Sequence, residues 1–359
     1  MKKNELFFPS ADKMTNIHMV MWEPDDEVLG VVNIVHGVTE HIMRYENFAQ
    51  FLTNHGIAVV GIDLLGHGLS TNNGTKKMYF GGVGSWNYVL EDIEKCLINS
   101  KEMYSGVPCT MLGFSLGSFL ARTYLINRPG IVDGAILVGT GYNSPLEISL
   151  ARSVVKSETK KYGDANATDK IRDLTFGTYN KKFKPNRTEY DWLCSSNEML
   201  DQYISDPLRG GVMSVGLFRE MLYGIEYTGD RKNIKRMHTG KPILLLSGSK
   251  DPVGAFGNGV NKVYKEFQRV GISDVTMRLY EGLRHDILHE DSRDIIYDDI
   301  LNWMKARKLV NDKKIYNKID SVNVSKNEEN VDIGKKLADS DEVESVLNNA
   351  NSKELKKSL

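Results

Sequence analysis

The sequence lacks the features that mark several classes of protein. Its 359 residues include only three cysteines, Cys96, Cys109 and Cys194, and their spacing matches neither a disulfide framework nor a zinc site. No stretch approaches the roughly 18 consecutive apolar residues of a membrane span. The basic start "MKKNELFFPSADK" is not followed by the apolar segment of a signal peptide. We therefore expect a cytoplasmic protein in a reducing compartment, with no transmembrane segment.

An excess of charge of either sign is also missing. Lysine and arginine number 46 against 47 aspartates and glutamates, so the net charge is -1. A nucleic-acid-binding protein would carry a basic excess, and we expect no nucleic-acid partner. Hydrophobic residues make up 41% of the chain, which is enough to build a large buried core in a protein of this length.

Short apolar runs alternate with amphipathic segments along most of the chain. The near-continuous apolar runs are "GVVNIVHG", "AVVGID", "CTMLGFS", "GAILVG" and "PILLLSG". Runs of this kind are typical of strands buried on both faces of a parallel sheet. Apolar residues recur at helical spacing in the segments 86–97 and 260–267 and again after Asp291. "NIHMVMWEP" and "DVTMRLYEG" alternate instead, as edge or half-covered strands would. The pattern predicts an α/β fold with a mostly parallel central sheet and helices on both faces.

The alternation of strand-like and helix-like segments stops in the middle of the chain, which indicates an insertion. We predict a first part of the core over residues 1–141, a helical cap over 142–238 and a second part of the core over 239–310. The polar composition of residues 311–359 predicts a disordered tail. One helical face in the cap is expected to pack in the core or to contact a ligand. Its members are Met213, Leu217, Met221, Leu222 and Ile225.

The stretch "TMLGFSLGSFLARTYL" places a serine between glycines where an apolar run meets a helical pattern. A serine at the end of a buried strand becomes accessible only if the backbone turns sharply, and Gly113 and Gly117 relieve the crowding of that turn. This is the G-x-S-x-G nucleophile elbow, with a strand before it and a helix after it. We expect Ser115 to be a nucleophile. The alternative is a loop in which the glycines only permit a turn.

A serine hydroxyl needs a base, and the base needs a group that fixes its tautomer. Asp251 follows the run "PILLLSGSK", and His285 follows the strand-like segment "DVTMRLYEGLR". Both would arrive at the carboxyl edge of the sheet, where Ser115 lies, in the chain order of a nucleophile-elbow enzyme. Three weaker candidates for the acid are Asp206, Asp274 and Asp286.

The segment "NIVHGVTEH" is a further strand that ends in a polar loop. An acyl-transfer intermediate carries a negative oxygen, which backbone amides can stabilise without a side chain. The expected pair of amides is that of Leu116, directly after the nucleophile, and that of Val38 in the loop. The side chains of His36 and Glu40 are expected to brace the loop by hydrogen bonds.

With these residues in place, the chain resembles the α/β-hydrolase superfamily, and within it the monoacylglycerol lipase and lysophospholipase-like serine hydrolases. The resemblance spans residues 17–304 and depends on "HGVTEH", "DLLGHGLS", "GFSLGS", "SGSKDPVG" and "YEGLRHDILHE". It implies nucleophile Ser115, acid Asp251 and base His285, an oxyanion hole of the Val38 and Leu116 amides, and a helical cap. Two departures are Leu65, where many relatives have arginine, and Val38 with Thr39, where small residues are frequent.

The implied activity is hydrolysis of a carboxylic ester, of lipid type such as a monoacylglycerol or lysophospholipid, through an acyl-enzyme on Ser115. Neither a metal nor an organic cofactor is required. The expected partner is a small acyl ester, with transient contact with a membrane surface.

Three other interpretations use the same residues. A peptidase or amidase of this fold would need Glu40 or a carboxylate of the cap to hold a substrate ammonium. A non-catalytic binding protein could retain the hydrolase scaffold. His285 and His289, spaced four apart around Asp286, resemble a zinc pair, but no long helix precedes them and no third ligand is evident. We expect His289 to lie at a helix start or on the surface.

Overall fold

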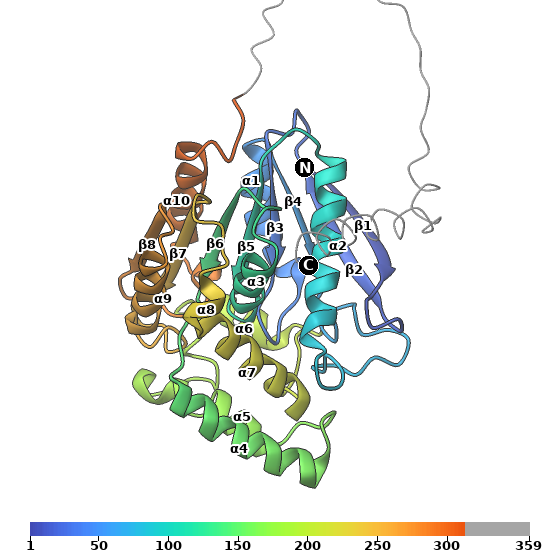
Figure 1. The fold of residues 1–359 in the computed structure, drawn as a ribbon, viewed down its shortest axis with the longest axis vertical. Coiled ribbons are helices and arrows are strands. Elements are labelled where there is room, and N and C mark those ends of the chain that lie inside the picture. The colour runs from blue at the N-terminus through green and yellow to red at the C-terminus, as the bar shows by residue number, and fades with distance from the viewer. Residues whose placement is uncertain (313–359) are drawn as a thin grey trace, which may run out of the picture. The chain divides into compact units, whose positions relative to one another are not determined.

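The fold is built on one sheet whose parallel strands end at a common edge. A computed structural model describes residues 1–312. The sheet has eight strands in the order β1-β2-β4-β3-β5-β6-β7-β8 (Figure 1). The strands are β1 (Lys2–Pro9), β2 (Asn16–Glu23), β3 (Gly30–Val35), β4 (Ile57–Ile62), β5 (Cys109–Phe114), β6 (Gly134–Val138), β7 (Ile243–Gly248) and β8 (Val275–Tyr280). Strands β4, β3, β5, β6, β7 and β8 run parallel, and β2 runs antiparallel to β1 and β4. The expected fold class is confirmed.

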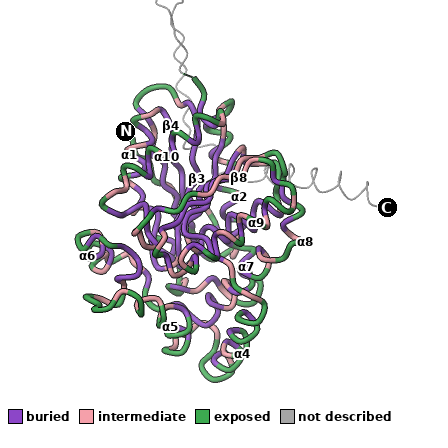
Figure 2. The backbone as a smooth tube through the Cα atoms, turned by 90° about the vertical axis from the view of Figure 1, so that its left-hand side faces the viewer, coloured by how far each residue is buried: buried purple, intermediate pink, exposed green. Residues whose placement is uncertain are grey.

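Each central strand is buried on both faces, so its side chains alternate between two cores. Val31 and Val35 of β3 belong to one core, which also contains residues of α2 (Trp86–Met103), α3 (Leu116–Asn127) and α9 (Asn258–Arg269). Val32 and Ile34 belong to the other core, which contains residues of α1 (Glu46–Asn54) and α10 (Arg293–Ala306). Figure 2 shows the buried strands in the middle of the molecule, with exposed backbone around them. Burial on both sides explains why these strands appear in the sequence as continuous apolar runs.

The helices are α1 (Glu46–Asn54), α2 (Trp86–Met103), α3 (Leu116–Asn127), α4 (Pro145–Tyr162), α5 (Asp169–Thr175), α6 (Asn197–Ser205), α7 (Val215–Gly229), α8 (Arg231–Ile234), α9 (Asn258–Arg269) and α10 (Arg293–Ala306). Short 3-10 turns are η1 (Ile42–Tyr45), η2 (Tyr179–Phe183) and η3 (Ile287–His289). Helices α4 to α8 come between β6 and β7, and α4 and α5 lie beyond one end of the sheet (Figure 1). The predicted tail, apart from its first two residues, lies outside the described residues.

The N-terminal segment differs from the expectation. It forms β1, which pairs with β2 along eight residue pairs, so β2 lies inside the sheet. Residues 17–22 of β2 are all buried, so this strand is neither an edge strand nor a half-covered one. The β1 run "KKNELFFP" is mostly exposed, and its only core-facing apolar residues are Leu6 and Phe8. Because this run has few apolar residues and several charged ones, its sequence shows no clear strand pattern. The other alternating segment, β8, does lie at the edge of the sheet.

A buried carboxylate joins the inserted helices to the core. Glu220 of α7 accepts hydrogen bonds from the backbone N–H of Trp86 at 3.0 Å and of Gly84 at 3.3 Å. These groups lie at the start of α2, where the amides have no partner within the helix and the helix dipole favours a negative charge. Arg219 donates to the same carboxylate at 3.1 Å.

We predict that Glu220→Gln lowers the free energy of unfolding by about 1–2 kcal/mol, because a charged acceptor at a helix start becomes a neutral one. Thermal and urea unfolding would measure the change. The matched control is Glu226→Gln, on the same helix, which removes an ion pair with Arg152 whose side chains are both 49% exposed. That control should cost less than about 0.5 kcal/mol. Equal losses in the two variants would contradict the capping role.

Candidate active site

Ser115 lies in a strained turn between β5 and α3. Strand β5 ends at Phe114 and helix α3 begins at Leu116, so the whole turn is one residue long. Ser115 has φ 51° and ψ -116°, a positive φ that residues with side chains rarely adopt. Such strain persists only where the surrounding structure enforces it. The turn matches the predicted elbow and lifts the serine out of the strand.

The two glycines of the motif allow α3 to lie directly against the sheet. A Cβ on Gly117 would lie 1.9 Å from the carbonyl oxygen of Val35 in β3, and one on Gly113 would lie 2.4 Å from the carbonyl oxygen of Gly117. Both obstacles are backbone atoms, which cannot rotate away. The glycines are therefore required by the packing and do not simply permit a turn.

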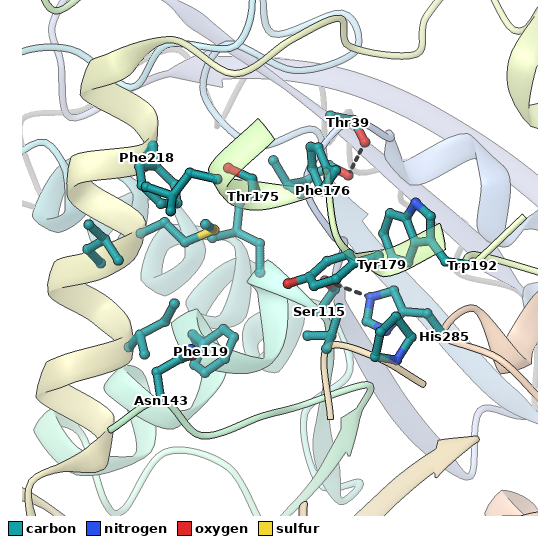
Figure 3. Close-up of a pocket in the computed structure, with 18 of the residues that line it drawn as sticks. Thr39, Ser115, Phe119, Asn143, Thr175, Phe176, Tyr179, Trp192, Phe218 and His285 are labelled. Atoms are coloured by element: carbon teal, nitrogen blue, oxygen red, sulfur yellow. Dashed lines mark hydrogen bonds between the residues drawn. The ribbon is translucent and has the colours of Figure 1, made fainter. Parts of the chain in front are cut away.

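The structure brings the three predicted side chains together. The Nε2 atom of His285 lies 2.9 Å from the Oγ atom of Ser115, a hydrogen bond drawn in Figure 3. The Nδ1 atom of His285 lies 2.9 Å from the Oδ1 atom of Asp251. This second contact is within ion-pair distance but departs from the alignment of a hydrogen bond. The chain order and the sheet edge proposed from the sequence therefore lead to one constellation.

Asp251 is held in place by two hydrogen bonds. It is fully buried, and it accepts hydrogen bonds from the Ser247 hydroxyl at 2.9 Å and from the Val253 backbone N–H at 2.8 Å. The three weaker candidates for the acid are engaged with other partners. Asp206 contacts His41, Asp274 pairs with Arg307, and Asp286 pairs with Arg44 and His289.

Packing fixes the position of the His285 ring, and nearby charges shift its pKa. Its ring lies 4.9 Å from that of Phe114 and 5.4 Å from that of Trp192, between centroids. Burial is the largest single influence and disfavours the charged ring, but the contact with Asp251 and the negative charges of Asp251, Asp286 and Glu40 together outweigh it. They raise the pKa of His285 above its ordinary value. An imidazole beside a carboxylate in this way is a stronger base than a free one.

The loop after β3 carries one of the two expected amides. Val38 and Leu116 line the same cavity as Ser115 and His285. The N–H of Val38 donates to no group among residues 1–312. Leu116 is the first residue of α3, so its N–H has no acceptor within the helix. Neither N–H thus has a hydrogen-bond acceptor among residues 1–312, and both residues line the cavity of Ser115.

Side chains brace this loop as expected. His36 accepts a hydrogen bond from the Leu64 backbone N–H at 2.9 Å and donates to the Gly37 carbonyl at 2.7 Å. Burial lowers the pKa of His36 to about 3, which keeps the ring neutral for both roles. Glu40 accepts from the Gly37 N–H at 2.5 Å and from the Tyr45 hydroxyl at 2.8 Å.

A buried charge network lies behind the loop, and the sequence did not predict it. Arg44 contacts Glu40 and donates to Asp286 at 2.8 Å. Asp286 also contacts His289 at 2.8 Å. Burial opposes the ionisation of Asp286, but His289 and Arg44 lower the pKa of its carboxyl below the usual value.

The position of His289 differs from the expectation. It is the last residue of η3, four residues before α10 begins, and it is 5% exposed, so it lies neither at a helix start nor on the surface. Its Nε2 atom contacts the Arg44 carbonyl at 2.8 Å. His285 and His289 therefore serve separate hydrogen-bond systems. Among residues 1–312 no group of three or more histidine, cysteine or acidic side chains is arranged to hold a metal ion.

Ser115 lines a cavity of about 470 Å³ to which the helices and loops between β6 and β7 contribute much of the wall. Its apolar wall comes from α4 and α7 and includes Ile148, Ala151, Phe218, Met221, Leu222 and Ile225. Thus Met221, Leu222 and Ile225 of the predicted helical face line the cavity, whereas Leu217 is fully buried and Met213 precedes the helix.

Residues from the irregular part of the cap complete the wall. Phe176, Tyr179 and Trp192 lie over the serine and histidine (Figure 3). The rings of Tyr179 and Trp192 meet edge to face, with their centroids 4.9 Å apart. The sequence reasoning missed them because they follow no helical or strand period. Their aromatic clustering was the only available signal.

Most of the chain matches one protein family. A family model described as serine aminopeptidase, S33, matches residues 26–292. The chain is 25% identical over 288 residues to the monoacylglycerol lipase of Mycolicibacterium smegmatis, across 79% of this chain and 91% of that protein. It is also 25% identical over 292 residues to the monoglyceride lipase of Homo sapiens, across 80% of this chain and 86% of that protein.

A solved structure shares the fold. The crystal structure of a highly thermostable carboxyl esterase from Bacillus coagulans, in complex with glycerol, superposes with a TM-score of 0.79. The two are 24% identical, and the match covers 86% of this chain and 99% of that chain. At this identity the likeness establishes the architecture alone.

We predict that Gly117→Ala destabilises the protein by about 2 kcal/mol or more, because the added methyl group meets the Val35 backbone and overpacks the turn. Chemical unfolding would measure the loss, and labelling of Ser115 by a fluorophosphonate should slow with it. Gly130→Ala is the matched control, since a Cβ added at that position would have no heavy atom within 4 Å. Wild-type stability in Gly117→Ala would contradict the close approach of α3.

Proposed function

Because the chain belongs to the serine aminopeptidase S33 family of α/β-hydrolases, we propose that this carboxylic ester hydrolase cleaves lipid esters through an acyl-enzyme on Ser115. The substrates are monoacylglycerols or lysophospholipids. The observation that carries the proposal is the Ser115 hydroxyl, 2.9 Å from the His285 ring, in a cavity whose wall from α4 and α7 is apolar. A hydroxyl hydrogen-bonded to a buried base is the starting point for nucleophilic attack.

The reaction has two steps. His285 takes the proton of Ser115 as the oxygen attacks the ester carbonyl, while Asp251 stabilises the resulting imidazolium. The Val38 and Leu116 amides donate to the negative oxygen of the intermediate, and His285 returns the proton to the departing alcohol. Water then repeats the sequence on the acyl-enzyme and releases the acid.

The cavity wall supports an acyl chain as part of the substrate. The apolar side chains of α4 and α7 that line it offer a continuous surface beside Ser115. Burial of each methylene of an acyl chain contributes about 0.8 kcal/mol. The names of the relatives, monoacylglycerol and monoglyceride lipase, favour the same substrate class.

The peptidase alternative finds less support. An aminopeptidase needs a carboxylate that is free to hold the substrate ammonium, and the cavity wall contains Glu40 and Glu147. Glu40 is engaged by Gly37, Tyr45 and Arg44. Glu147 accepts from the Ser144 backbone and hydroxyl in the capping box of α4.

A non-catalytic binding protein is the remaining alternative. Such a protein would not need the hydroxyl, imidazole and carboxylate in contact, nor the strained backbone of Ser115. The presence of all these features favours an enzyme, and a mechanism-based probe separates the two possibilities.

We also propose a cytoplasmic location with transient contact with a membrane surface. Cys96, Cys109 and Cys194 are all buried free thiols, as in a protein of a reducing compartment. None of the helices within residues 1–312 combines the length and the apolarity that a membrane crossing requires.

We expect the wild-type protein to hydrolyse short to medium-chain p-nitrophenyl esters and monoacylglycerols, and to leave aminoacyl amides intact. Ser115→Ala should abolish both hydrolysis and fluorophosphonate labelling, whereas Ser153→Ala, on the exposed face of α4, should keep both. Spectrophotometric rates and gel-based labelling give the two measurements. A folded wild-type protein that is neither labelled nor active would support the binding alternative, and faster cleavage of aminoacyl amides than of esters would support a peptidase.

The raised pKa of His285 determines how the rate of ester hydrolysis depends on pH. Only the neutral ring accepts the serine proton, so kcat/KM for a soluble ester should rise with pH through a midpoint above the ordinary histidine value of 6.5. Asp251→Asn removes the attraction that favours the charged ring, so the midpoint should fall and kcat should drop by about 10⁴-fold. Asp274→Asn, which disrupts a pair with Arg307, is the control and should keep the wild-type profile. An unchanged midpoint in Asp251→Asn would exclude Asp251 as the acid.

A further inference from the structure

A second groove of about 410 Å³ lies beside α8 and α9 and is strongly basic. It is lined by Tyr142, Gly229, Arg231, Lys262, Lys265, Glu266 and Arg269. Helices α8 and α9 are neighbours in both views of the fold (Figures 1 and 2). Four cationic side chains thus surround one carboxylate.

Two lysines of the groove, Lys262 and Lys265, remain without an ion pair within the described part of the chain. Glu266 accepts two hydrogen bonds from Arg231, at 2.8 and 3.0 Å, and one from Arg269 at 2.5 Å. Lys262 and Lys265 form no ion pair with any carboxylate of residues 1–312, and Lys265 is exposed. The single negative charge is already shared between two arginines, so the groove has an excess of three positive charges.

The basic character continues along the chain at α8. The segment 231–250, "RKNIKRMHTGKPILLLSGSK", has no acidic residue, and Lys232 and Lys235 in it are exposed. The chain as a whole has a net charge of -1. Lys232 and Lys235 thus lie close in the chain to Arg231 of the groove, and the excess of positive charge in the groove lining favours an anionic partner.

The groove adjoins the substrate cavity. Tyr142 lines both, and the Lys262 ammonium lies 4.9 Å from the centre of the Tyr142 ring. The start of α9 is held against the same residue, because a Cβ on Gly259 would lie 3.3 Å from the Tyr142 backbone nitrogen. A ligand that occupied the groove would be separated from the cavity by one side chain.

We propose that this groove binds the phosphate of an anionic phospholipid at the surface of the membrane that supplies the substrate. Lys262 and Lys265 contact the phosphate, and the paired arginines add to the local positive potential. The proposal rests on the proposed lipid-ester function, since a lipid surface is the partner that presents phosphates and acyl chains together. Salt weakens an attraction of this kind, because it screens exposed charges.

The test is co-sedimentation of the full chain with vesicles of phosphatidylcholine, with and without phosphatidylglycerol, at low and high salt. Wild-type protein should bind the vesicles that contain phosphatidylglycerol, and high salt should weaken binding. The double variant Lys262→Gln with Lys265→Gln should bind about 25-fold more weakly, at about fivefold per lysine. It should hydrolyse a soluble ester at the wild-type rate.

The matched control is Lys76→Gln with Lys77→Gln, which makes the same change of charge at lysines outside the groove. It should bind vesicles like the wild type. Equal binding by wild type and the groove variant, or an equal loss in the control, would overturn the proposal.

A separate arm titrates inorganic phosphate calorimetrically. Lysine-dependent phosphate binding without vesicle binding would assign the groove to a soluble phosphate and overturn the lipid-surface proposal. A protein that binds vesicles through the two lysines but cleaves no ester would support the groove and refute the proposed function. The two failures are therefore distinguishable.

Discussion

The contact of α3 with β3 at Gly117 is the constraint on which the site depends. A side chain at this position would meet the carbonyl oxygens of Val35 and His36, so the start of the helix lies directly on the end of the strand. Val35 ends β3 and His36 begins the loop that carries Val38. The same contact therefore sets the place of Ser115 and brings the amides of Val38 and Leu116 to the same cavity. The strained φ of Ser115 is a consequence of this fit.

The parts of the fold that follow from local patterns could be predicted from the sequence. Strands buried on both faces must be apolar at nearly every position, which made β3 to β7 visible as continuous runs. Parallel strands end at one edge, so the residues after β5, β7 and β8 were expected to meet, and Ser115, Asp251 and His285 lie together in the structure. The prediction succeeded because it needed only strand direction and chain order.

The features that depend on long-range contacts could not be predicted in this way. Strand β1 is mostly exposed, and its pairing with β2 comes from backbone hydrogen bonds that leave little trace in side-chain type. Tyr179 and Trp192 reach the cavity from segments without regular period. Arg44 and Asp286 are 242 positions apart in the chain, and nothing in either local sequence indicates their contact.

Asp286 and His285 are neighbours in the chain but have different environments. His285 faces Ser115 and Asp251, whereas Asp286 faces Arg44 and His289. The Nδ1 atom of His289 faces an Asp286 carboxylate oxygen, and its Nε2 atom faces the Arg44 carbonyl oxygen. The Arg44 guanidinium contacts both buried carboxylates, that of Glu40 and that of Asp286. Each carboxylate therefore has a cation beside it. This pairing is what allows the acidic groups to lie together behind the loop of Val38, because a buried charge without a partner would be strongly destabilising.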